Sequence, residues 1–345
     1  MDKKINALLQ LADYLRAPLT DELDAIMTRT TIENQWFTRE NQLIALDAIA
    51  NHFLDEQQLR GWLSRYDFSE NDQNYSENTP LKTVGIVMAG NLPLVGFHDF
   101  LCVFVSGCRA VIKLSDKDKR LLPFLVQKLT EYYPEMANLV VFQDNLKEID
   151  ALIATGSTNT SRYFDYYFSK IPHIIRKNRT SVAVLRGSET EEEFHQLGID
   201  IFRYFGLGCR NVAKLYVPRG YDFNLLLEKL HDFNSLVLHH KYKNNFDYNF
   251  TLTILNKVPH LSNGCTILVE EKVLHSRIAM LHYEYYDALE EVQTAITAQY
   301  DAIQCVVGNV KLADIEVLPF GKTQQPELWD YADRMDTMAW LNELR

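Results

Sequence analysis

Cys209 is the residue of this sequence whose setting best suits a nucleophile. It stands in Phe205-Gly206-Leu207-Gly208-Cys209-Arg210-Asn211-Val212, and the apolar run 212–217 reads as a strand directly behind it. Glycine adopts positive φ and lets another molecule approach the backbone closely, and nearby backbone N–H groups can stabilise an oxyanion beside the sulfur. The alternative is a small buried core residue, the usual state of a free cysteine. This segment alone leaves both interpretations open.

Three further segments carry groups that suit a phosphate or a ribose. They are Met88-Ala89-Gly90-Asn91, Lys113-Leu114-Ser115 and Thr155-Gly156-Ser157. Each follows an apolar run, and ligands of open α/β sheets bind beyond the carboxyl ends of the strands. Taken singly, the segments equally fit an Asn-capped turn, a solvated lysine and an ordinary helix N-cap. No G-x-G-x-x-G follows a strand, so the usual dinucleotide fingerprint is missing.

Apolar runs alternate with helical patterns along most of the chain. This alternation predicts an α/β fold with doubly wound parallel sheets. Residues 1–66 show helical spacing and the polar residues 67–80 read as a loop. We expect strands at 84–89, 110–114, 139–142, 151–154, 181–185, 212–217, 250–256, 266–270 and 303–307, and helices at 96–106, 121–133, 189–205, 222–232 and 286–299.

Composition narrows the class of protein. There are 35 basic and 46 acidic residues, a net charge of −11, which argues against a nucleic-acid partner. The start of the chain lacks a signal-peptide core and no apolar run approaches a membrane span. Five cysteines without a C-x-x-C pair fit reduced thiols in a cytoplasm, and no Cys/His cluster has metal-ligand spacing. We therefore expect a cytoplasmic protein without an integral membrane segment or a bound metal.

The order of the four segments resembles the aldehyde dehydrogenase superfamily. The matching motifs are Asn91-Leu92-Pro93, Lys113, Thr155-Gly156-Ser157 and Gly206-Leu207-Gly208-Cys209, within about residues 83–220. Over most of the chain, including 85–100, 206–218 and Phe320-Gly321-Lys322-Thr323-Gln324-Gln325-Pro326, the sequence is more similar to the long-chain acyl-CoA reductases. That family is related to the fatty acid reductase of bacterial luminescence.

The resemblance implies roles for individual residues. Cys209 would be the nucleophile that takes the acyl group, and Asn91 would stabilise the oxyanion together with the Cys209 backbone N–H. Lys113 and Ser115 would hold the adenosine ribose or its 2′-phosphate. The complete set expected to bind NADPH, or NADH, is Ala89, Gly90, Lys113, Ser115, Thr155, Gly156 and Ser157.

The resemblance also implies an aldehyde dehydrogenase-like architecture and an activity. We expect a helical segment (1–80), a nicotinamide-dinucleotide-binding domain (81–205), a catalytic-cysteine domain (206–318) and a C-terminal loop and helix (319–345). The implied reaction is NAD(P)H-dependent reduction of a long-chain fatty acyl-CoA to the aldehyde through an acyl-cysteine. The alternative is a non-redox acyltransferase or acyl-thioester-binding protein that uses the same cysteine. Expected partners are the acyl-CoA substrate and either a second copy of the chain or a protein that delivers acyl groups.

One departure from the superfamily pattern bears on the direction of the reaction. Oxidising members carry Glu-Leu-Gly-Gly where this chain reads Arg176-Lys177-Asn178-Arg179. The glutamate that would activate water is therefore missing, which favours reduction of the acyl-enzyme over its hydrolysis. The four residues themselves are interpreted as a solvated basic loop. Glu270 and Glu271 lie near the position of the superfamily's second cofactor glutamate, without its flanking phenylalanine.

Overall fold

A computed structural model of the chain describes residues 1–67, 81–156, 164 and 166–344. The chain divides into two compact units. Unit 1 consists of Met1–Lys177 and Glu327–Arg345, and unit 2 of Asn178–Pro326. The boundary expected at residue 206 falls inside unit 2.

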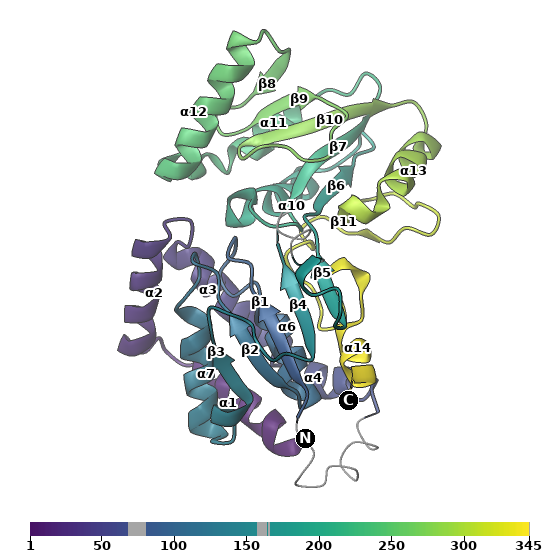
Figure 1. The fold of residues 1–345 in the computed structure, drawn as a ribbon. Helices are drawn as coiled ribbons and strands as arrows, with labels where there is room; N and C mark the ends of the chain where they lie inside the picture. Colours follow the sequence, from purple (N-terminus) through teal and green to yellow (C-terminus); the bar gives the residue numbers. More distant parts are fainter. Residues whose placement is uncertain (68–80, 157–163, 165, 345) are drawn as a thin grey trace. The chain divides into compact units, whose positions relative to one another are not determined.

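Unit 1 contains a parallel sheet with the strand order β3-β2-β1-β4-β5 (Figure 1). The strand order reverses at β1, so the sheet is doubly wound, as the sequence predicts. Its strands are buried on both faces, which explains why they read as continuous apolar runs. The strands are β1 (Thr83–Val87), β2 (Arg109–Lys113), β3 (Val140–Phe142), β4 (Ala151–Thr155) and β5 (His173–Arg176).

Helices α6 (Phe97–Ser106) and α7 (Leu121–Tyr132) connect β1, β2 and β3 in sequence. Nearly every side chain of α6 is buried, because the C-terminal helix α14 (Thr337–Leu344) also packs on it. This helix ends at Gly107, whose φ of 86° is the left-handed conformation common after a helix. The short helix α8 (Met136–Leu139) precedes β3.

The N-terminal helices share one hydrophobic core with this sheet. Leu8 and Leu11 of α1 (Asp2–Arg16) belong to the same cluster of buried side chains as Ile86 and Ile112. The remaining N-terminal elements are α2 (Asp21–Glu33), α3 (Arg39–Ala48), the π-helical turn η1 (Ile49–Phe53) and α4 (Glu56–Leu63).

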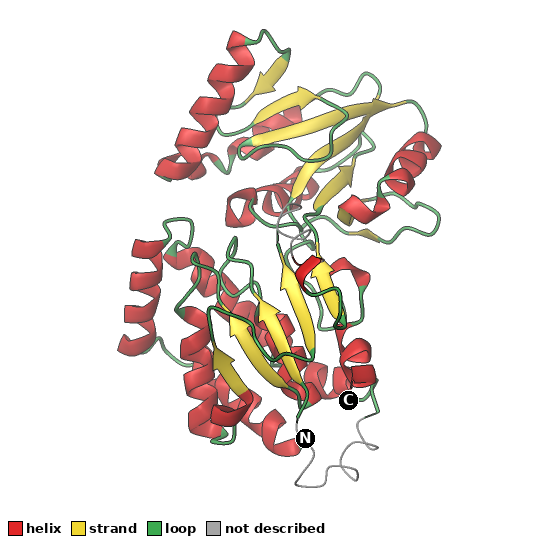
Figure 2. Ribbon diagram, in the orientation of Figure 1, coloured by secondary structure: helices red, strands yellow, loops and turns green. Residues whose placement is uncertain are grey.

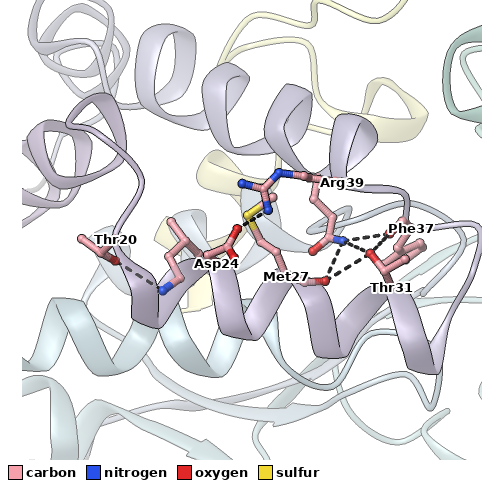
Figure 3. Close-up of polar contacts among 8 residues, drawn as sticks. Thr20, Asp24, Met27, Thr31, Phe37 and Arg39 are labelled. Carbon is pink, nitrogen blue, oxygen red and sulfur yellow. Dashed lines mark hydrogen bonds and ion pairs between the residues drawn. The ribbon is translucent and has the colours of Figure 1, made fainter.

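A buried glutamine fixes the connection between α2 and α3 (Figure 3). The Nε2 of Gln42 donates to the carbonyls of Met27 (3.1 Å) and Phe37 (2.8 Å) and lies 2.9 Å from the Thr31 hydroxyl. An ion pair between Arg39 and Asp24 joins the same two helices at the surface. The buried amide thus links a carbonyl within α2 to a carbonyl in the turn between the helices.

Unit 2 contains a second sheet with the order β12-β11-β6-β7-β10-β9-β8. Its strands run parallel except β8, which is antiparallel to β9. Helices separate β6 from β7, β7 from β8 and β10 from β11 along the chain (Figure 2), whereas β8, β9 and β10 follow one another without a helix between them. The strands are β6 (Thr180–Val184), β7 (Val212–Pro218), β8 (His260–Ser262), β9 (Ile267–Glu270), β10 (Met280–Tyr286), β11 (Ile303–Gly308) and β12 (Val317–Leu318).

Helices cover both faces of this sheet. On one face, α10 (Glu191–Phe202) and α11 (Asn224–His231) bury Leu197 and Leu226 against Leu215. On the other face, Ile296 of α13 (Leu289–Ala298) packs in a cluster with Val184. The expected α/β class with two doubly wound, largely parallel sheets is therefore confirmed.

The predicted strand at 250–256 is wrong. These residues belong to α12 (His240–Leu255) and the residue that follows it. The buried face of α12 consists of Tyr242, Phe246, Asn249 and Thr253, a helical spacing in which two members are polar. Residues 251–254 include Thr251, Thr253 and Ile254, whose β-branched side chains favour a strand locally, but tertiary packing overrides this propensity. The sequence did not predict β5, β8, β10 and β12; β10 ends at Tyr286, the residue at which a helix was expected to begin.

The C-terminal segment is anchored to unit 1 by a buried network of hydroxyl groups. The hydroxyl of Tyr331 accepts from the Trp62 indole N–H (2.7 Å) and lies 2.6 Å from the Tyr66 hydroxyl. Trp62 is fully buried, so its N–H has lost its access to water. Residues 62 and 331 are far apart in the sequence, and this contact holds the returning chain in place.

We predict that Tyr331→Phe lowers the free energy of unfolding by about 1–3 kcal/mol, because the buried Trp62 N–H loses its acceptor. Urea denaturation measures the change. Tyr66→Phe is the matched control, since it removes a half-buried hydroxyl and keeps the bond between Trp62 and Tyr331. Equal losses for the two variants would contradict this account.

Candidate active-site turn and strand ends

Cys209 lies on an exposed turn at the amino edge of the unit 2 sheet. All five cysteines fall within the described residues, and Cys209 is the exposed one among them. We call residues 203–211 the Cys209 turn; it consists of η2 (Arg203–Gly206) and the residues that lead from η2 into β7. The thiol is therefore accessible, as a nucleophile requires, and the alternative of a buried core cysteine does not apply.

Three consecutive residues of this turn have left-handed backbone conformations. Their φ angles are 55° at Tyr204, 60° at Phe205 and 73° at Gly206. This conformation costs a non-glycine residue roughly 1–2 kcal/mol. Such strain persists only where the surrounding structure enforces it, and it concentrates at functional sites.

Hydrogen bonds tie the turn to the sheet behind it. The Ser181 hydroxyl of β6 donates to the Cys209 carbonyl (3.1 Å) and accepts from the Cys305 N–H of β11 (3.1 Å). The guanidinium of Arg210 donates to the Thr323 carbonyl (2.6 Å). The turn is therefore held by strand β6 at the Cys209 carbonyl and by the 320–326 loop at the Arg210 side chain.

The Phe320–Pro326 motif supports the turn from a second side. The Asp200 carboxylate, buried near the end of α10, accepts from the Gly321 N–H (2.7 Å), the Thr323 N–H (3.0 Å) and the Thr323 hydroxyl (2.7 Å). Burial raises the pKa of this carboxyl, although these three donors oppose the effect. The segment that carries the family resemblance near the C-terminus thus packs beside the Cys209 turn through Asp200 and Arg210.

Two backbone N–H groups before Cys209 are already used within the turn. Gly208 N–H donates to the Asn211 side-chain oxygen (2.8 Å), and Leu207 N–H to the Tyr204 carbonyl (3.2 Å). Neither group is available to an oxyanion in this arrangement. The expectation that N–H groups near the sulfur stabilise an oxyanion therefore excludes those of Leu207 and Gly208.

The His239–Tyr242 segment lies beside the turn. The His239 ring packs on Phe205 with a centroid separation of 4.4 Å, and its Nδ1 accepts from the Tyr242 N–H at the start of α12. The segment thus caps a helix.

The carboxyl edge of the unit 2 sheet is a separate region. A cavity of about 480 Å³ lies there, lined by residues that follow β6 and β7, including Arg186, Glu189 and Tyr221. Glu270 ends β9 and pairs in register with Tyr283 of β10, which in turn pairs with Leu215. Cys209 precedes β7, so neither the cavity nor Glu270 lies at its edge of the sheet.

The candidate cofactor residues of unit 1 follow strands that are neighbours in the sheet. Val87 at the end of β1 pairs with Lys113 of β2 and with Ala154 of β4. The segments after these three strands therefore gather at one edge, as parallel pairing requires. Asn91 is exposed in the first of them. Asn91 belongs to unit 1 and Cys209 to unit 2.

Gly90 and Ser115 are in close contact at this edge. A Cβ atom placed on Gly90 would lie 2.3 Å from the Ser115 Oγ and 2.6 Å from its Cβ. Only glycine fits there without displacing the serine. Lys113 is exposed at the end of β2, and Ala89 is half-buried beside Gly90.

Thr155 and Gly156 are half-buried at the end of β4, and Ser157 lies outside the described residues. The Gly156 N–H donates to the Arg176 carbonyl (3.3 Å), so Gly156 offers close approach rather than an N–H donor. Arg176 is itself buried, 2.7 Å from the Asp99 carboxylate, and its guanidinium donates to the Thr337 hydroxyl (2.9 Å). The interpretation of this arginine as part of a solvated loop is wrong, because its charge is compensated inside unit 1.

Asp118, which sequence reasoning missed, holds the Asn91 turn in place. Its Oδ2 accepts from the Leu94 N–H (2.9 Å), and Leu94 has a φ of 56°. Burial raises the pKa of this carboxyl to about 6, and the Leu94 N–H only partly offsets the effect. The sequence does not show this role of Asp118, because its partner Leu94 lies on a different loop, 24 residues earlier in the chain.

No group of three or more His, Cys, Asp or Glu side chains is arranged to bind a metal in the part of the chain that the structure describes. Among the described helices, none is long and apolar enough to cross a membrane.

Comparison with protein families shows one match, to the family described as Acyl-CoA reductase (LuxC), over residues 2–222. The match spans unit 1 up to its return segment and the Cys209 turn with β7. A search of curated proteins found no match.

Solved structures of aldehyde dehydrogenases share the fold. The P. syringae indole-3-acetaldehyde dehydrogenase, a mutant solved with NAD+ and IAA, is 12% identical with a TM-score of 0.64, covering 90% of this chain and 72% of its own. The benzaldehyde dehydrogenase of Corynebacterium glutamicum is 11% identical with a TM-score of 0.64, covering 89% and 76%. At such identities the likeness establishes the aldehyde dehydrogenase fold, as the resemblance implied.

We predict that Asp118 makes stability fall as pH rises from 4.5 to 7. Its pKa is about 6 when folded against a usual value of 3.8, so the folded state holds the proton over a range where the unfolded state has lost it. The group should account for a fall of about 2 kcal/mol in the free energy of unfolding, at 1.36 kcal/mol per pKa unit. Asp118→Asn keeps an acceptor for Leu94 and should remove this part of the fall, measured by urea denaturation at both pH values. An unchanged pH dependence in the variant would refute the assignment.

Proposed function

Because the chain belongs to the acyl-CoA reductase (LuxC) family, we propose that it reduces a long-chain fatty acyl-CoA to the aldehyde through an acyl-cysteine on Cys209. Family membership identifies the chain as an oxidoreductase of aldehyde-related chemistry. The chain length of the acyl group and the covalent intermediate are part of the proposal.

The observation that carries the proposal is the exposed thiol of Cys209 on a strained, anchored turn. The other four cysteines are buried, so a reaction that needs a thiolate nucleophile has this one accessible candidate. The segment Arg176–Arg179 further supports reduction, because it holds no carboxylate to activate water.

The proposed chemistry divides a difficult reduction into two steps. In the first, the Cys209 thiolate attacks the thioester carbonyl, a new C–S bond forms, and the bond to CoA breaks to release its thiolate. In the second, hydride adds to the acyl carbonyl, the C–S bond to Cys209 breaks, and the aldehyde leaves with the thiolate restored. The Asn91 amide and the Cys209 backbone N–H are proposed to stabilise the oxyanion in both steps.

The strand ends of unit 1 fit a nicotinamide dinucleotide. NADPH or NADH supplies the hydride when bound. Gly90 follows β1, the central strand of the three whose ends carry candidate residues. Because it has no Cβ, Ser115 packs against it and a cofactor can approach its backbone closely. Lys113 and Ser115 are proposed to contact the adenosine ribose or its 2′-phosphate, and Ala89, Thr155, Gly156 and Ser157 to line the rest of the site. The NAD+ complex of the P. syringae enzyme supports this choice of cofactor class.

We predict that Cys209→Ala abolishes covalent labelling by a radioactive long-chain acyl-CoA, because the attacking sulfur is gone, while NADPH binding measured by fluorescence titration stays at the wild-type level. Cys108→Ala is the control, since it removes a buried thiol and should keep the label. Stoichiometric labelling of the Cys209 variant would contradict the assignment of Cys209 as the nucleophile.

Cofactor binding separates the redox proposal from its alternative. Wild-type protein that binds neither NADPH nor NADH at millimolar concentration would point to the non-redox alternative.

We predict that Gly90→Ala weakens binding of the reduced nicotinamide by about tenfold, equivalent to about 1.4 kcal/mol. The added methyl group overlaps Ser115 and must displace it from the proposed ribose site. Fluorescence titration with NADPH and NADH measures the loss. Gly61→Ala is the matched control in α4, where no atom lies within 4 Å of the added Cβ. An affinity equal to that of the control would remove Gly90 from the site.

A further inference from the structure

Asn211 makes an unusual set of contacts for a residue two positions after the nucleophile. Its Nδ2 lies within hydrogen-bond distance of the carbonyls of Asp200 (3.0 Å), Ile201 (3.2 Å) and Arg203 (2.9 Å). Its Oδ1 accepts from the Gly208 N–H at 2.8 Å. The Asn211 side chain is 3% exposed, so its own amide group is satisfied by these backbone partners out of contact with bulk water.

These contacts bridge the two ends of the strained turn. Asp200 and Ile201 lie in the last turn of α10, where carbonyls have no partner further along that helix, and Arg203 is the first residue of η2. Gly208 lies on the other side of the left-handed residues Tyr204, Phe205 and Gly206. The Asn211 amide therefore bridges the backbone before and after the three left-handed residues, directly beside Cys209.

We propose that Asn211 is a positioning residue for the nucleophile: it holds the left-handed turn closed and so fixes where the Cys209 sulfur meets the acyl carbonyl. The inference rests on the proposed role of Cys209. The proposed role is indirect: Asn211 acts on the position of the sulfur through Gly208 and the backbone between residues 208 and 211.

Asn211 is needed because the left-handed conformations of the turn cost free energy. Tyr204 and Phe205 favour right-handed or extended conformations, and without the bridging amide the backbone can relax toward them. The sulfur then leaves its place although it stays exposed. A displacement of about 1 Å from attack geometry reduces rates by about 100-fold, whereas substrate binding elsewhere on the protein is unaffected.

The test compares the acylation of Cys209 in Asn211→Ala with that in Asn249→Ala. Asn249 is equally buried in the same unit and donates to the Ile278 carbonyl (3.0 Å), so its loss disturbs a buried amide away from the turn. Formation of the acyl-enzyme from a radioactive long-chain acyl-CoA is followed by rapid quench over a range of substrate concentrations. Alkylation by iodoacetamide reports separately whether the thiol remains accessible.

We expect Asn211→Ala to lower the maximal acylation rate by about 100-fold, with the half-saturating acyl-CoA concentration little changed and iodoacetamide alkylation retained. Asn249→Ala should acylate as fast as the wild type. Adding Tyr204→Gly to Asn211→Ala should recover part of the lost rate, because glycine adopts positive φ without strain. Recovery through residue 204 is not expected of a general loss of stability.

Three outcomes overturn the inference. Acylation of Asn211→Ala at the wild-type rate shows that the turn keeps its geometry without the amide. An equal loss in Asn249→Ala shows an effect of stability alone. Wild-type protein that is alkylated by iodoacetamide but never acylated defeats the proposed function, and the inference with it. Should Asn211→Ala not fold, hydrogen exchange of the wild-type Gly208 N–H decides: strong protection supports the closed turn, and exchange at the rate of a free amide refutes it.

Discussion

Parallel strand pairing is the constraint on which the candidate regions of unit 1 and of unit 2 each depend. In unit 1, the pairing of Val87 with Lys113 and Ala154 gathers the ends of β1, β2 and β4 at a carboxyl edge. In unit 2, the pairing of Ser181 with Val212 brings the start of β6 beside the turn that precedes β7. Residues after strands and residues before strands therefore collect at opposite edges, which suits a dinucleotide in one sheet and a presented thiol in the other.

The elements of unit 1 depend on contacts between segments far apart in the sequence. Arg176 at the end of β5 is neutralised by Asp99 of α6 and donates to Thr337 of α14. Removing either partner would leave a buried charge, which is far more costly than losing a surface ion pair. The strand that leads out of unit 1 and the segment that returns to it are thus held by the same guanidinium, alongside the contact of Tyr331 with Trp62.

Apolar patterning made most of the sheet predictable, because strands buried on both faces are continuous apolar runs whatever their partners. It failed at α12, where Asn249 and Thr253 occupy the buried face and obscure the helical period. The motifs that contain Asn91, Lys113 and Cys209 could be proposed as site segments because small and polar residues stand directly beside strands. Asp118, Asp200 and Arg176 could not, since a buried polar residue takes its meaning from a partner on another element. The order of strands in a sheet could not be predicted either, because it depends on pairing between strands that are far apart in the sequence. β6, for example, lies between β11 and β7.

The strain at the Cys209 turn falls on residues that a sequence pattern would not select. Glycines 206 and 208 suggest a flexible loop, but two of the three left-handed positions are Tyr204 and Phe205. Phe205 is also packed on His239, so it cannot be exchanged for glycine without losing a buried ring. A flexible turn would present the sulfur in many positions, whereas a strained one, closed by a buried amide and bonded to Ser181, presents it in few. Gly208, directly before Cys209, then contributes a hydrogen-bond donor more than flexibility, because its N–H donates to the Asn211 side chain and so holds the turn closed.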